Sequence, residues 1–284
     1  MEKRAKIRRY YQADVYALDV SGLADTGFED ELESRLTKIG KFVVTSLKIN
    51  DGFHEAITGK RLGVIDMTNP VLGVYKNGLD YPNLYVDCTH LKPLTVKEKE
   101  KLLSEYPTQD RNEIEMFLCR KTILNGSVPR GKSFFKAKIV NLKPGFEDEY
   151  IKNGYSVKGL ERYINDFGSY IVSTTKDKGT FVEILTGEVF GSYVEEIGFN
   201  PNGDPRYYID KYSSEKYPLM FVDREHKELI EGKELQDKFE AYYYVITGEE
   251  LKTFFDKTEK DLEEGKEPVQ FGSEVSLTMK GKKN

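Results

Sequence analysis

The pattern of apolar and polar positions divides the chain into two similar halves. Residues 40–63 and 168–191 align without a gap, and eight of their 24 positions are identical. The shared positions include the Thr-Gly dipeptides at 58–59 and 186–187, where glycine supplies the positive φ of a tight turn. Because unrelated segments share far fewer identities, this similarity predicts an internal repeat.

Each half predicts the same order of elements. Residues 42–47 and 170–175 are rich in β-formers, and each segment runs into a turn sequence, Asn-Asp-Gly or Asp-Lys-Gly. The short connections that follow join antiparallel strands. We therefore expect an α+β fold, a tandem duplication of a module with a mainly antiparallel sheet and about two helices per copy.

Helical spacing of apolar residues predicts one helix in each copy, at 28–39 and at 157–167, and each stretch is followed by a glycine. A second helix in each copy is expected after Thr95 and after Thr247. Both threonines precede a glutamate by three residues, which is the sequence of a capping box.

These elements suggest a domain organisation. We expect a first repeat over residues 1–124, a linker over 125–132, and a second repeat over 133–284. Extra residues near 224–240 are interpreted as an insertion in the second repeat, which also carries a C-terminal extension.

Composition narrows the class of protein. The 284 residues are 38% hydrophobic, which is enough for folded domains, and no apolar run approaches the roughly 18–20 residues of a membrane helix. Cys88 and Cys119 are the only cysteines, as is typical of a reducing cytoplasm. The net charge is −5, and all of the acidic excess lies in residues 129–284. Proteins that bind duplex nucleic acid usually carry a basic excess instead, so the charge argues against that class. We expect a cytoplasmic protein without a membrane partner.

One segment has the spacing of a phosphate-binding loop. Gly126, Gly131, Lys132 and Ser133 fit the pattern G-x-x-x-x-G-K-[ST], so the segment resembles the P-loop nucleotidase family over about a dozen residues. The resemblance implies a nucleotide with Mg²⁺. A P-loop opens a helix, however, and the residues after Ser133 alternate in the manner of a strand. The alternative interpretation is a connection between the repeats.

The duplication places two histidines at equivalent positions. Asp87 precedes His90, and Asp223 precedes His226, by three residues in each copy. Such a pair can orient an imidazole for acid–base catalysis or for a metal. The alternative is an aspartate that closes a turn beside an exposed histidine, and no third ligand or nucleophile accompanies either pair. We therefore expect neither a catalytic site nor a metal site.

Aromatic residues form the third signal. The chain has 19 Tyr and 16 Phe but no Trp, and tyrosines occur in adjacent pairs. Exposed aromatic rings between lysines can stack on single-stranded bases or contact a protein partner, whereas buried rings belong to the core. The candidate contact residues are Tyr10, Tyr11, Tyr207, Tyr208, Tyr242 and Tyr243.

Taken together, these patterns predict a non-enzymatic binding protein, an adaptor or inhibitor of a protein partner, that needs no cofactor. Two related modules in one chain suit a bivalent contact. A single-strand nucleic-acid-binding protein and a P-loop-like nucleotide-binding protein are the alternatives. The sequence does not specify the partner or the oligomeric state.

Overall fold

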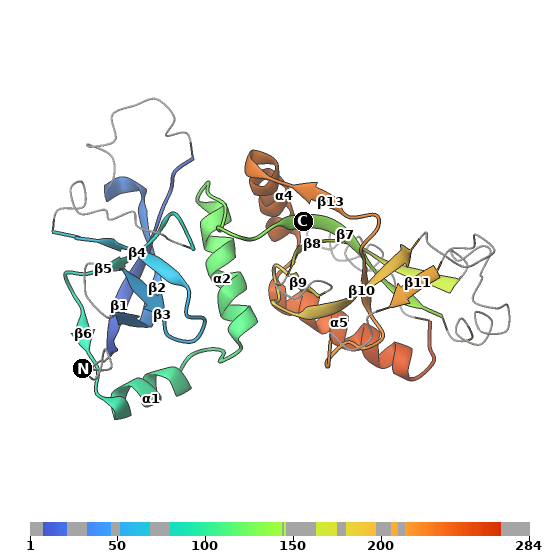
Figure 1. Cartoon of the computed structure of the whole chain (residues 1–284), viewed down its shortest axis with the longest axis horizontal. Helices are drawn as coiled ribbons and strands as arrows, with labels where there is room; N and C mark the ends of the chain where they lie inside the picture. Colours follow the sequence, from blue (N-terminus) through green and yellow to red (C-terminus); the bar gives the residue numbers. More distant parts are fainter. Residues whose placement is uncertain are drawn as a thin grey trace, which may run out of the picture. The chain divides into compact units, whose positions relative to one another are not determined.

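The protein, described from a computed structural model, contains both sheets and helices, as expected (Figure 1). The chain divides into two compact units, Met1–Gly131 with Glu231–Tyr242, and Lys132–Ile230 with Tyr243–Asn284. The structure describes residues 8–21, 33–46, 52–68, 80–143, 145, 163–174, 180–196, 206–209 and 214–267.

The sheet of the first unit closes on itself. β1 pairs with β2 through one edge and with β5 and β6 through the other, while β3 and β4 complete the ring from β2 to β5. Of the described strand pairs in this sheet, only β4 and β5 are parallel, and a long connection separates them, as a parallel pair requires. Its strands are β1 (Arg9–Leu18), β2 (Leu36–Ser46), β3 (Phe53–Glu55), β4 (Arg61–Ile65), β5 (Leu84–Asp87) and β6 (Lys92–Pro93).

The sheet of the second unit has the same ring of pairings. β7 pairs with β8, β9 connects β8 to β10, and β12 closes the ring between β10 and β7. The β10–β12 pair is parallel. β11 extends the sheet beyond β10. Its strands are β7 (Phe134–Leu142), β8 (Ile164–Thr174), β9 (Phe181–Glu183), β10 (Val189–Glu196), β11 (Arg206–Ile209), β12 (Phe221–Asp223) and β13 (Glu228–Ile230).

The two rings also agree in register. Tyr11 pairs with Pro93 between β1 and β6, and Phe135 pairs with Leu229 between β7 and β13. The first strand of each ring shifts register against its partner at the same position, next to Val15 in β1 and at Ile139 in β7. A bulge in the same place bends both strands in the same way.

Four α-helices lie in the described residues, and both expected capping boxes are confirmed. The side chains of Thr95 and Thr247 accept hydrogen bonds from the backbone N–H groups of Glu98 and Glu250. The side chains of these glutamates in turn accept the backbone N–H of the threonine. The helices are α1 (Val96–Ser104), α2 (Arg111–Leu124), α4 (Gly232–Val245) and α5 (Gly248–Glu263), preceded by a 3-10 turn, Glu33–Arg35.

The helices expected at 28–39 and 157–167 are wrong where the structure describes them. Leu36 and Ile39 lie in β2, and Ile164 and Phe167 lie in β8. The long strands β1 and β7 offer backbone partners beyond the bulge, and this pairing outweighs the local helical spacing of the apolar residues. The remainder of both predictions falls outside the described residues.

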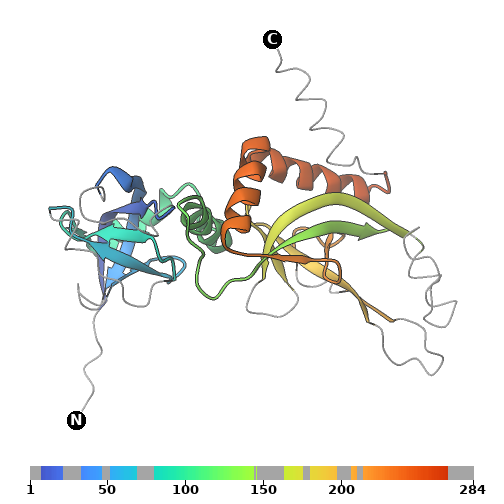
Figure 2. The ribbon, with the colours of Figure 1, turned by 90° about the horizontal axis from the view of Figure 1, so that it is seen from above.

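The core of the second unit is an aromatic cluster between α5 and the sheet. The ring of Phe255 lies 5.4 Å from that of Tyr170 in β8 and 4.9 Å from that of Phe190 in β10, and the ring of Tyr217 stacks on Phe190. Figure 2 shows α5 running along the long strands β7 and β8. In the first unit, Leu118 of α2 is fully buried, and the Tyr81 hydroxyl donates to the Glu115 carbonyl of the same helix.

Candidate functional site

The repeated Asp–His pairs lie at the ends of equivalent strands. Asp87 ends β5 and Asp223 ends β12, and the Oδ2 of each contacts the Nδ1 of its histidine, at 2.8 Å in His90 and 2.9 Å in His226. The aspartates are largely buried, whereas both histidine side chains are 70% exposed. Each carboxylate therefore orients a solvent-facing imidazole.

The same carboxylates also close turns. Asp87 Oδ1 accepts the backbone N–H of Thr89, and Asp223 Oδ1 accepts those of Glu225 and His226. This is the local side-chain-to-backbone bonding by which aspartate commonly ends a strand. The turn alone accounts for an aspartate at both positions.

A lysine–aspartate ion pair accompanies each Asp–His pair. Asp14 and Lys38 are 2.6 Å apart in the first unit, and Lys138 and Asp166 are 2.6 Å apart in the second. The hydrogen bond to Asp223 raises the pKa of His226, which favours the imidazolium.

The surroundings of these pairs supply no metal ligand set and no activated thiol. Across the described parts of the chain, no group of three or more His, Cys, Asp or Glu side chains is arranged to hold a metal ion. Burial raises the pKa of the neighbouring Cys88, which disfavours the nucleophilic thiolate. The geometry of the pairs thus supports a structural role, with an imidazole presented to solvent.

The P-loop-like segment has the geometry of a connection. Ser133 leads directly into the strand β7, so no helix N-terminus faces a phosphate there. The backbone N–H groups of Gly126, Ser127 and Arg130 already donate to the carbonyls of Ile123, Thr122 and Asp80. Gly131 has a positive φ of 70° in the loop that leads to Lys132. The segment therefore matches the P-loop pattern in sequence only, because a strand follows Ser133 where the pattern requires a helix.

Gly126 has a packing reason of its own. Its φ is +76°, and a Cβ placed there would lie 2.8 Å from the backbone nitrogen of Ser21. Glycine is needed where the loop crosses the end of β1, irrespective of any ligand.

The candidate contact tyrosines separate into different environments. Tyr11 is buried and its ring meets the edge of Phe53, so its interpretation as a contact residue is wrong. Tyr10 is half-buried, with the Lys99 ammonium 5.1 Å from its ring. Tyr207 and Tyr208 belong to β11, and their side chains lie outside the described features. Tyr242 is half-buried on α4.

Among the residues whose burial the structure describes, the exposed aromatic side chains gather at the end of α4. Tyr243 is 46% exposed, Tyr244 is 85% exposed and Val245 is 46% exposed, and the two tyrosine rings are 6.5 Å apart. Sequence reasoning included Tyr243 but missed Tyr244 and Val245. The run of three tyrosines before a valine at a helix end was the available signal.

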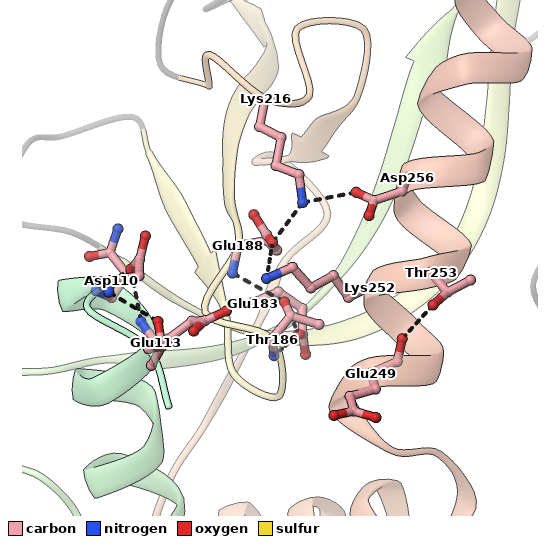
Figure 3. Close-up of polar contacts among 12 residues, drawn as sticks. Asp110, Glu113, Glu183, Thr186, Glu188, Lys216, Glu249, Lys252, Thr253 and Asp256 are labelled. Carbon is pink, nitrogen blue, oxygen red and sulfur yellow. Dashed lines mark hydrogen bonds and ion pairs between the residues drawn. The ribbon is translucent and has the colours of Figure 1, made fainter. Parts of the chain in front are cut away.

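A buried glutamate explains several identities of the repeat. Glu183 is fully buried, and its carboxylate accepts the backbone N–H groups of Leu185 and Thr186 and the Thr186 hydroxyl (Figure 3). Glu55 makes the same bonds to Ile57 and Thr58. These residues hold a turn in each sheet and are structural.

A charged network lies where α5 meets the sheet. The Lys216 ammonium lies 2.9 Å from Glu188 and 2.8 Å from Asp256, and Lys252 lies 3.1 Å from Glu188 (Figure 3). The Asp256 carboxylate also accepts the Tyr217 hydroxyl at 2.6 Å. Two cations and two anions neutralise one another here, so the network holds α5 in place.

Glu259 is a buried acid with one unsatisfied oxygen. Its Oε1 accepts the Leu219 N–H, its Oε2 has no hydrogen-bond partner, and burial raises its pKa from the usual 4.5 to about 7. The folded protein then holds a proton that the unfolded chain releases above pH 4.5. Stability should therefore fall as pH rises from about 4.5 to about 7.

We expect Glu259→Gln to remove this pH dependence, because the amide stays neutral and still accepts from Leu219. Allowing for solvent screening, the variant should exceed the wild type by about 1–2 kcal/mol at pH 8 and match it near pH 5. Urea unfolding at the two pH values measures this, with the exposed Glu249→Gln as control. A variant that is less stable than the wild type at pH 8 would contradict it.

Comparisons with known proteins give no family for this chain: it matches no model of a protein family, none of the curated proteins and no solved structure. Within the described residues, no helix has both the length and the apolar composition to cross a lipid bilayer.

Proposed function

We propose that this is a non-enzymatic binding protein of the cytoplasm, an adaptor or inhibitor of a protein partner, built from two copies of one α+β module. The proposal rests chiefly on the exposed apolar end of α4. Cys88 and Cys119 are both thiols and are not joined in a disulfide, which fits a reducing compartment.

The duplication is supported by the shared ring of strand pairings and by their register. The shared capping boxes would match α1 with α5, but the strand pairings match the helices differently. β6 and β13 pair at matching positions with the first strand of their ring, so α1 corresponds to α4 and α2 to α5. Under this assignment the segment 224–240 is no insertion, because β13 and the start of α4 are the counterparts of β6 and α1.

The end of α4 offers a surface suited to protein recognition. α4 buries Leu235 and Phe239, yet it ends on Tyr244, which is largely exposed, between Tyr243 and Val245, which are each nearly half exposed. Tyrosine combines a large apolar ring with a hydroxyl that can hydrogen-bond, and it is enriched in protein interfaces. Among the sheet aromatic residues whose burial the structure describes, Tyr11 is buried and is not available to a partner.

The test is the variant Tyr243→Ser with Tyr244→Ser. A partner recovered with the wild-type protein from its native host should bind the purified variant at least about tenfold more weakly, as expected for two central contacts. Val96→Ser, which removes an exposed apolar side chain from α1, is the matched control and should bind normally. Unchanged binding by the double variant would contradict the proposal.

Two further assays address the alternatives. A melting temperature raised by ATP with Mg²⁺, and no longer raised in Lys132→Ala, would favour nucleotide binding instead. Salt-sensitive anisotropy of a labelled single-stranded oligonucleotide would favour nucleic-acid binding. We expect neither response.

A further inference from the structure

Two ion pairs occur at matching places in the two units with their charges reversed. Asp14 of β1 pairs with Lys38 of β2, whereas Lys138 of β7 pairs with Asp166 of β8. The positions correspond in register, because Lys38 lies opposite Tyr16 and Asp166 lies opposite Val140, just beyond the bulge in each strand pair. The acid and the base have therefore exchanged strands.

The second pair joins a sheet to a helix. Lys60 and Glu115 of α2 are 3.3 Å apart, and Glu188 and Lys252 of α5 are 3.1 Å apart. Lys60 and Glu188 both follow a Thr-Gly turn and donate their backbone N–H to its threonine hydroxyl. Glu115 and Lys252 both stand five residues after the N-cap of their helix.

The reversal has a consequence for a duplicated chain. Copies that share a sheet, a turn and a helix can exchange these elements during folding, which is a typical failure of repeat proteins. α2 docked on the sheet of the other copy would bring Glu115 beside Glu188, and α5 would bring Lys252 beside Lys60. Both contacts join like charges, whereas the native contacts join opposite charges.

The strands show the same selectivity. β1 paired with β8 would bring Asp14 beside Asp166, and β7 paired with β2 would bring Lys138 beside Lys38. Asp14 and Lys38 are diagonal neighbours across their strand pair, as are Lys138 and Asp166, and like charges at such positions weaken the pairing of the strands. All four exchanged contacts are repulsive, and all four native contacts are attractive.

We infer that the reversed ion pairs direct each strand pair and each helix to its own copy, by making the exchanged arrangements repulsive. This inference rests on the proposed duplication. Because the ion pairs are partly exposed, each adds little to the stability of the native fold. The free-energy difference between the native and the exchanged arrangement is larger, since every exchanged contact both loses an attraction and gains a repulsion.

The test gives both copies the same polarity. In the full chain, Asp14→Lys, Lys38→Asp, Lys60→Glu and Glu115→Lys together keep both ion pairs of the first copy but make the exchanged contacts attractive. A neutral control replaces Asp14 with Asn and the other three residues with Gln. All proteins are refolded from urea, and the misassembled fraction is quantified as larger species by size-exclusion chromatography with light scattering and as non-native monomer by its near-UV circular dichroism.

We expect the misassembled fraction to increase from the wild type to the neutral control and again to the polarity-matched variant, which should exceed the wild type at least about fivefold at low salt. The increase should shrink near 0.5 M NaCl, where screening weakens exposed charges. Ion pairs that served stability alone would give a different order, with the neutral control worst and the polarity-matched variant like the wild type. That order would overturn the inference.

Equilibrium unfolding in urea separates this inference from the duplication. A polarity-matched variant that unfolds with the wild-type midpoint but does not misassemble counts against the steering role alone. A variant that loses more stability than the neutral control shows that the positions are not equivalent, which overturns the inference and counts against the duplication as well.

Discussion

Replacing Phe255 with alanine is expected to lower the free energy of unfolding of the second unit by about 3–5 kcal/mol. The side chain is fully buried where the rings of Tyr170, Phe190 and Tyr217 meet. Its removal leaves a cavity that these rings cannot fill without leaving their positions on the sheet. Urea unfolding followed by circular dichroism measures the loss.

The control for this variant is Tyr244→Ala on α4, which removes another aromatic ring from a helix. Tyr244 is 85% exposed, so its removal should change stability by no more than about 0.5 kcal/mol. A Phe255→Ala variant that loses less than about 1.5 kcal/mol would show that α5 does not pack on the sheet through this residue.

The second large effect is expected at the buried glutamate of each turn. Glu183→Ala should cost about 2–4 kcal/mol, because it leaves the N–H groups of Leu185 and Thr186 and the Thr186 hydroxyl without their acceptor. Glu55→Ala should cost a similar amount in the first unit, where the corresponding donors belong to Ile57 and Thr58.

A graded series identifies the cause. Glu183→Gln keeps the size of the side chain and one acceptor oxygen, so it should lose roughly half as much as the alanine variant. Glu249→Ala, on the exposed start of α5, is the surface control. Equal losses in the glutamine and surface variants would exclude the buried hydrogen bonds as the source of the effect.

The elements that sequence reasoning found are those whose determinants are local. The turn in each 24-residue block depends on a glutamate, a threonine and a glycine within five residues, and the capping boxes at Thr95 and Thr247 depend on a residue three positions away. Such signals are complete within a short window of sequence. The prediction of a repeat depends on these local signals.

The elements that it missed depend on partners far away in the chain. Leu36 and Ile164 have helical spacing with their neighbours, yet β1 and β7 draw them into long strands. β6 and β13 are only two and three residues long, and their pairing with the first strand of each ring decides which helices correspond. No local sequence pattern predicts a strand this short.

The candidate sites divide in the same way. The spacing of Asp87 and His90 correctly indicated a contact, because three residues bring a strand end back on itself. Exposure depends on the whole fold, so buried Tyr11 and exposed Tyr244 could not be distinguished by their residue type. The strand expected after Ser133 is present and pairs with β8, so the helix that a P-loop requires does not follow this segment.

Backbone contacts between strands, measured by NMR in the full chain, test the duplication most directly. We predict contacts between Tyr11 and Pro93 and between Phe135 and Leu229, together with parallel contacts of Gly63 with Tyr85 and of Gly191 with Phe221. Helical chemical shifts directly after Ser133, or one of these sets without its counterpart, would contradict it.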